Sequence, residues 1–322
     1  MAELTEILDR KKLELASSPH IHSKWNTRNV MLSVIIALLP AMIAGIVVFG
    51  IYQLAIVAVS IIFCVLTESV IKKIRKQPIS IKDSSAILTG LLLALILPPN
   101  FSLVFTALGA IVSIVIGKEV FGGLGFNIFN PALVGRAFLQ AAFPVPMTTW
   151  IMPSLGVDAV SSATPLASFK FDQVAADMMP MFLGNTGGCI GETSSIAILL
   201  GGLALVAMKI VNWRIPVSML AGVILFGGIL WLVDPTAFVN PLYHILAGGF
   251  LFGAFFMASD WVTSPITNKG IWIFGLGISL VLIMIRIFGG VPEGVMYGIL
   301  FMNTFVPLIN KYTRPKLFGA KK

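Results

Sequence analysis

The chain has 322 residues, of which 57% are hydrophobic and only 11% are charged, and its mean hydropathy is +0.96. A soluble domain carries about 25% charged residues, so this composition excludes an ordinary soluble enzyme and indicates an integral membrane protein. The formal net charge of +8 lies mostly in short stretches between apolar segments, and it therefore does not indicate a nucleic-acid partner.

After a polar N-terminal arm at 1–29, apolar segments recur along the chain. A helix rises about 1.5 Å per residue, so about 20 residues cross the hydrocarbon core of a bilayer. Seven segments approach that length: 30–49, 51–71, 101–117, 194–211, 216–233, 271–288 and 294–310. Three are shorter or more broken and need protein neighbours: 85–97, 131–143 and 240–258. The predicted fold class is an all-α membrane protein with about ten transmembrane segments.

Basic residues predict the orientation, because lysine and arginine are enriched in cytoplasmic loops. They cluster in the arm, between the second and third segments, in later loops and at the C-terminus: Arg10, Lys11, Lys12, Lys72, Lys73, Arg75, Lys76, Lys82, Lys209, Arg214, Lys269, Lys311, Arg314 and Lys316. Both termini are therefore expected in the cytoplasm of a cell bearing this protein in its inner membrane. The long 144–193 loop carries a net charge of −3 and is expected outside.

A weak internal repeat divides the membrane part into two halves. Ile87-Leu88-Thr89-Gly90-Leu91 resembles Ile245-Leu246-Ala247-Gly248-Gly249, and Phe121-Gly122-Gly123 recurs as Phe288-Gly289-Gly290. Chance similarity of glycine-rich apolar sequence is the alternative. Because each half has five crossings, two similar halves must be inverted relative to each other. The predicted parts are the arm 1–29, repeats 30–143 and 194–312, the outer loop 144–193 and a basic tail 313–322.

Motifs of soluble redox enzymes are missing from the sequence. No phosphate-binding lysine motif or dinucleotide fingerprint occurs. The cysteines Cys64 and Cys189 are solitary, and the chain has only three histidines, so no disulfide or metal site is predicted. No catalytic residue is assigned, and the chain is not expected to bind NADH or an iron–sulfur cluster unaided.

Charged residues inside apolar segments are candidates for an ion path, because a charge at the bilayer centre costs about 2.5–3.5 kcal/mol. The candidates chosen on this basis are Glu119, Arg136, Asp260 and Glu293. Most of them lie near segment ends, where interfacial solvation is the competing explanation.

The outer loop contains the most specific chemical pattern. Asp158, Ser161, Ser162 and Ala163 precede Thr164, and Pro165 follows it. This spacing matches the acceptor pattern of flavin transferases, which esterify the phosphate of FMN to a threonine hydroxyl. Ser162 replaces the usual glycine, which weakens the match mildly. A serine-rich turn before a proline is the alternative.

Motifs elsewhere support the first interpretation. They are Ser17-Ser18-Pro19-His20-Ile21, the 121–132 stretch, Gly191-Glu192-Thr193-Ser194, the 258–265 stretch and Glu293-Gly294-Val295-Met296-Tyr297. Together they resemble, over essentially the whole chain, the family of membrane flavoproteins that contains RnfD of the Rnf complex (an ion-translocating ferredoxin:NAD oxidoreductase). NqrB of the sodium-pumping NADH:quinone oxidoreductase belongs to the same family.

The resemblance implies a urea-channel-like bundle of two inverted five-helix repeats, with FMN bound covalently to Thr164 and possession of a second, non-covalent riboflavin. It also implies a place in the lipid bilayer beside Rnf subunits A, B, C, E and G. Electrons would pass between the FMN of RnfG, this flavin and RnfC, which holds the NAD site, and a flavin transferase would load the FMN. The coupling ion, Na⁺ or H⁺, stays open.

Two other functions remain at this stage. The chain length and short arm favour the Rnf protein over an NqrB-like component of the sodium-pumping quinone reductase. A stand-alone channel or secondary transporter explains the repeat and the buried charges, but it does not explain a flavin-acceptor motif.

Overall fold

The computed structural model describes residues 26–78, 81–152 and 163–315. The described residues form helices and contain no strand element. Most of the predicted N-terminal arm, the C-terminal end of the tail and three members of the attachment motif, Asp158, Ser161 and Ser162, lie outside the described residues.

Every apolar segment predicted in the first half is helical. The elements are α2 (Thr27–Phe49), α3 (Tyr52–Ile74), the short η1 (Ile81–Asp83), α4 (Ser85–Leu95), α5 (Leu103–Ile114), its π-helical continuation η2 (Val115–Glu119) and α6 (Pro131–Ala142). Asn130 caps α6, because its side chain accepts hydrogen bonds from the backbone N–H groups of Ala132 and Leu133. Pro131 then occupies the first helical position, where its missing N–H costs nothing.

The second half repeats this order, with a more broken third segment. It contains α10 (Ser195–Ala207), α11 (Arg214–Val233), α12 (Pro241–Leu246), α13 (Phe250–Phe252), the π-helical η3 (Gly253–Met257), α14 (Asn268–Phe288) and α15 (Val295–Thr313). The break after α12 falls at Gly248, which has a φ of +68° that favours glycine. By length and composition, α2, α3, α11 and α14 are long and apolar enough to cross a membrane.

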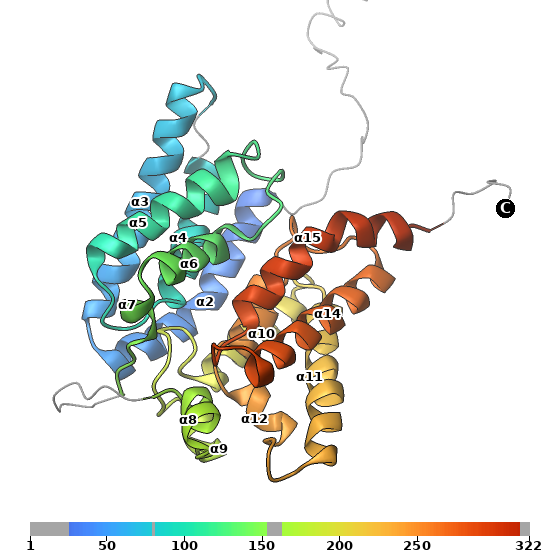
Figure 1. The fold of residues 1–322 in the computed structure, drawn as a ribbon. Coiled ribbons are helices and arrows are strands. Elements are labelled where there is room, and N and C mark those ends of the chain that lie inside the picture. The colour runs from blue at the N-terminus through green and yellow to red at the C-terminus, as the bar shows by residue number, and fades with distance from the viewer. Residues whose placement is uncertain (1–25, 79–80, 153–162, 316–322) are drawn as a thin grey trace, which may run out of the picture.

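The connection between the halves is more structured than an extended loop. It contains α7 (Pro144–Thr148), α8 (Pro165–Asp172) and α9 (Met178–Leu183). In Figure 1, α8 and α9 lie at one end of the molecule, and the C-terminal ends of α3 and α15 lie toward the other.

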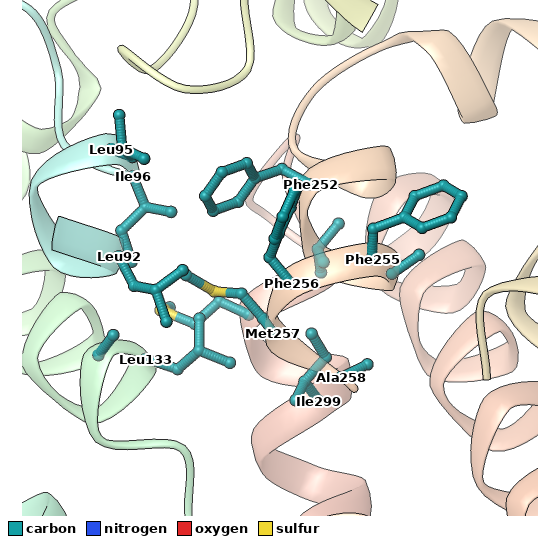
Figure 2. Close-up of a cluster of buried hydrophobic side chains, with 14 of the residues drawn as sticks. Leu92, Leu95, Ile96, Leu133, Phe252, Phe255, Phe256, Met257, Ala258 and Ile299 are labelled. Atoms are coloured by element: carbon teal, nitrogen blue, oxygen red, sulfur yellow. The ribbon is translucent and has the colours of Figure 1, made fainter. Parts of the chain in front are cut away.

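The main core lies where the broken segments of the two halves meet. Figure 2 shows Leu92 and Ile96 of α4 facing Phe252, Phe256 and Met257 of the second half. Each of these side chains is at most 6% exposed. Across the halves, α2 packs against α10 and α6 packs against α15. The two halves therefore share one hydrophobic core.

Small residues allow close helix packing within each half, as is common where membrane helices associate. A Cβ atom added at Gly135 would collide with Ser113 of α5, and one added at Gly275 would collide with Ser218 of α11. The Ser279 hydroxyl, on α14, donates to the Met219 carbonyl of α11 at 2.7 Å.

Candidate functional site

Thr164, the predicted attachment residue, lies at the N-cap of α8. Its side-chain oxygen accepts a hydrogen bond from the Ala167 N–H at 3.2 Å, and the residue is only 5% exposed. Ala163 beside it is exposed. The expectation of a freely displayed hydroxyl is therefore wrong for the chain alone, because helix capping turns this hydroxyl toward the protein.

Helix α8 is fixed to the second half by several contacts. The Tyr243 hydroxyl donates to the Pro165 carbonyl at 2.7 Å. Lys170 Nζ donates to three carbonyl oxygens at the end of α14 and just beyond it: Ile285 at 3.2 Å, Arg286 at 2.9 Å and Val291 at 3.1 Å. Phe169 packs against Tyr243 with ring centroids 6.1 Å apart. The start of α8 is thus held rigidly on the membrane bundle.

A small cavity of about 20 Å³ adjoins Thr164. Its walls include Gly187, Gly188 and Gly248, together with the carboxylate-bearing Glu192 and Glu293. A cavity of this size holds about one water molecule and has no room for a flavin ring.

A buried charge cluster lies behind this cavity. Arg136 of α6 donates from Nη2 to Glu293 Oε2 at 2.6 Å, and its Nη1 lies 3.5 Å from Glu192 Oε1. Glu192 Oε2 and Arg136 Nε are buried and have no hydrogen-bond partner among the described residues. Cys189 is fully buried, and its Sγ lies within 4.8 Å of both carboxylates. The cluster joins the first half, the connection and the second half.

A second charge cluster lies within the first half. Lys118 Nζ is 2.7 Å from Glu68 Oε2 and 2.6 Å from the Ser85 hydroxyl. Lys72 Nζ is 3.0 Å from the other oxygen of Glu68. Arg75 donates to the Glu119 carbonyl oxygen at 2.7 Å, and its guanidinium lies 3.6 Å from the Glu119 carboxylate.

The four ion-path candidates therefore do not form one site. Arg136 and Glu293 contact each other, Glu119 belongs to the cluster of the first half, and Asp260 lies apart. Asp260 accepts hydrogen bonds from the Val262 N–H and the Thr263 hydroxyl. It borders a cavity of about 450 Å³ between the halves.

This large cavity is mainly apolar, with polar groups on part of its wall. The polar lining includes Ser85, Thr89, Lys118, Asn127, Asn130, Ser259 and Asp260, and Trp261 adds an aromatic ring. A mostly apolar pocket with a few placed polar groups is typical of a small-molecule site.

Sequence reasoning missed the role of Glu192, which was counted only as a loop charge. The signal available was its place in Gly191-Glu192-Thr193-Ser194, a motif already singled out, directly before an apolar segment. Its pairing with Arg136 depends on the return of the connection into the bundle, where the N–H groups of Ile190 and Gly191 donate to the Leu97 and Leu95 carbonyls.

The architecture defines a multi-pass, all-helical membrane protein with ion pairs buried between its halves. Comparison with known proteins gives the family: residues 14–319 match the NQR2, RnfD, RnfE family. The chain belongs to this family, which confirms the resemblance predicted from its motifs.

Similar proteins cover nearly the full length of the chain, and they are subunits D of membrane complexes. That of a proton-translocating ferredoxin:NAD(+) oxidoreductase complex from Clostridium ljungdahlii is 45% identical over 96% of both chains. That of a Na(+)-translocating ferredoxin:NAD(+) oxidoreductase complex from Acetobacterium woodii is 43% identical over 98% of both. That of an ion-translocating oxidoreductase complex from Yersinia enterocolitica is 36% identical over 96% of this chain and 99% of its own.

Proposed function

We propose that this chain is the membrane subunit of an ion-translocating ferredoxin:NAD oxidoreductase complex and relays electrons through an FMN esterified to Thr164. The observation that carries the proposal is full-length similarity to subunits D of such complexes, 45% and 43% identical, in a chain that retains the acceptor motif. Because the relatives are named for H⁺ in one case and Na⁺ in the other, the names do not select the ion.

The residues at Thr164 fit the phosphate end of FMN. A helix N-terminus carries partial positive charge and N–H groups that stabilise a phosphate, and Thr164 begins α8. Neighbouring Ala163 is small and exposed, which leaves room for a transferase to reach the hydroxyl once the cap opens. The adjoining cavity is too small for the ring, so the flavin ring would lie outside it. Bound FMN would supply one- and two-electron transfer.

The chain's own contribution is to hold the attachment point. Tyr243 and Lys170 fix the backbone of α8 against α14, so the ester oxygen would stay at one place while partner subunits deliver and remove electrons. Partners such as the FMN-bearing RnfG and the NAD-site RnfC, with Rnf subunits A, B and E, complete the reaction, since no nucleotide-binding motif was found in the sequence.

The cavity of about 450 Å³ is the candidate site for the non-covalent riboflavin. It combines apolar walls with Lys118, Asn127 and Asp260, and its aromatic Trp261 is held in place because Nε1 donates to the Ile210 carbonyl at 2.6 Å. A flavin needs such a flat apolar space with a few hydrogen-bonding groups at its edges.

Packing supports two inverted repeats of five segments. In the first half α3 packs on α5 and α5 on α6, and in the second half α11 packs on α14 and α14 on α15. The contacts between halves pair α2 with α10 and α6 with α15, which are equivalent elements, as a two-fold relation requires. The channel-like alternative shares this fold, but the flavin motif and the relatives favour the redox protein.

Clustering of basic stretches supports the proposed orientation, with both termini cytoplasmic. Trp261 contacts Ile210, and the Ile266 N–H donates to Asn310 at 3.0 Å, so the stretches that carry Lys209, Lys269 and Lys311 gather at one end. Positive charge at that end is typical of the cytoplasmic side.

The attachment is tested by peptide mass spectrometry of the chain produced with its complex and a flavin transferase. We expect an FMN-sized mass addition on the peptide containing Thr164, with loss of this addition in Thr164→Val. Thr148→Val, at an exposed hydroxyl in α7, is the matched control and should keep the flavin. An unmodified Thr164 in the wild-type complex would refute the proposal.

The riboflavin site is tested by filling the cavity. Val34 of α2 lines it, whereas Val47 of the same helix is 65% exposed. Val34→Trp should reduce the flavin released on denaturation, with the covalent flavin retained, and Val47→Trp should release the normal amount. Equal release from both variants would place riboflavin elsewhere.

A further inference from the structure

Glu192 is a buried acid with one oxygen left over. Its side chain is 4% exposed, Oε1 faces Arg136 at 3.5 Å, and Oε2 has no hydrogen-bond partner among the described residues. A buried carboxylate oxygen without a partner costs free energy unless it binds a proton, a cation or water. The side chain is also confined, because a Cβ atom added at Gly249 would lie 2.5 Å from Oε1.

This unpartnered acid and the attachment residue line the same small cavity. Thr164 and Glu192 both border the space of about 20 Å³, which is large enough for one water molecule. A charge added near Thr164 is felt strongly at Glu192, because Coulomb interactions are weakly screened inside a protein.

The charges that face Glu192 leave it poised between protonation states. Arg136 of α6 is shared with Glu293, which precedes α15, so a single guanidinium serves two carboxylates. Arg286 of α14 also interacts with both acids, but its guanidinium is hydrogen-bonded to the His244 and Ala247 carbonyls. Burial and the charge of Glu293 raise the pKa of Glu192, whereas Arg136 opposes this rise. The remaining neighbour is the buried Cys189 thiol.

We propose that the Glu192 carboxylate is a redox-linked proton-binding site, which takes up one proton when the cofactor at Thr164 is reduced. The inference rests on the proposed attachment of FMN to Thr164 and goes beyond it by assigning charge compensation to this chain's own residues. Glu293, whose side chain is 20% exposed, connects the cluster to the aqueous side. Arg136 is a positioning residue that holds both acids.

The step is balanced in charge and atoms. One electron arrives from a one-electron donor centre of the complex, and one proton comes from water on the side where α8 lies. The carboxylate of Glu192 forms an O–H bond and becomes a carboxylic acid. No other bond changes, and the local charge is the same before and after.

Redox-difference infrared spectroscopy of the purified complex tests the proposal, because a protonated carboxylic acid has its own C=O stretching band. Reduction should produce this band in the wild type and in Glu119→Gln, which alters a buried acid in the other charge cluster. The same band should be missing from Glu192→Gln and from flavin-free Thr164→Val. A band that persists unchanged in Glu192→Gln would overturn the inference.

A second variant covers the case in which Glu192→Gln does not assemble. Glu293→Gln keeps Glu192 but removes one negative neighbour and leaves Arg136 to Glu192 alone. The infrared band should therefore remain, and the pH at which half of it appears should fall. An unchanged or higher midpoint would contradict the proposal.

The covalent flavin also gives an electrochemical measurement. Its midpoint potential should depend less strongly on pH in Glu192→Gln than in the wild type, at equal flavin content by mass spectrometry. Equal pH dependence in the two proteins overturns the inference alone, because flavin is present on Thr164. If the wild type carries no flavin on Thr164, the proposed function itself fails.

Discussion

Lys118 Nζ lies 2.7 Å from Glu68 Oε2 inside the first half, and it also donates to the Ser85 hydroxyl. The ammonium group thereby joins η2, α3 and the start of α4. In the second half, Arg286 near the end of α14 donates to two carbonyls of the broken α12 region. Each half therefore has a buried cation two or three residues before its Phe-Gly-Gly sequence, bonded to its third segment.

Replacing this lysine should destabilise the protein. Lys118→Met leaves Glu68 with Lys72 as its cationic partner, so we expect a loss near the lower end for a broken buried pair, about 3 kcal/mol. The measurement is thermal unfolding of the purified protein in detergent. Lys73→Met, at an exposed position on α3, is the control, and the double variant Glu68→Gln/Lys118→Met should recover part of the loss.

Removing the Thr164 hydroxyl should separate stability from function. Thr164→Val removes the cap of α8, which costs about 1 kcal/mol, so the complex should still assemble. Ferredoxin-dependent NAD reduction and the ion gradient should be lost together, while centres upstream of this flavin still become reduced. Thr148→Val should retain both activities, and a Thr164→Val complex with normal coupled turnover would contradict the relay.

Topology can be measured with added cysteines. The prediction that reagents reach Cys189 from outside is wrong for the isolated fold, because both native cysteines are buried. Asp172→Cys at the end of α8 and Lys76→Cys after α3 are exposed positions instead. A hydrophilic thiol reagent added to intact cells should label the first and spare the second. The opposite labelling would reverse the proposed orientation.

Close packing of α11 on α14 should tolerate no added methyl group at Gly222. A Cβ atom there would lie 2.6 Å from Ser279 Cβ, whereas one at Gly228 of the same helix meets nothing closer than 3.7 Å. Gly222→Ala should therefore cost about 1–3 kcal/mol through overpacking. Gly228→Ala should be neutral or stabilising by up to about 1 kcal/mol, since alanine favours a helix. Equal melting temperatures would contradict this packing.

The sequence by itself determined the membrane class, the helical segments and the family. These depend on local properties: apolar length, the Asn130-Pro131 and Asn240-Pro241 starts, and motifs read directly from neighbouring residues. The acceptor motif at Thr164 was likewise visible, because a flavin transferase reads contiguous sequence.

Only the tertiary structure decided how the buried charges pair. Arg136 and Glu293 are 157 residues apart, and Glu192 joins them because the connection folds back against α4. No periodicity encodes such a contact, since it depends on how two halves pack together. For the same reason the burial of Thr164 at the start of α8, and of Cys189 beside the two acids, could not be predicted: both depend on which surface the chain between the halves covers.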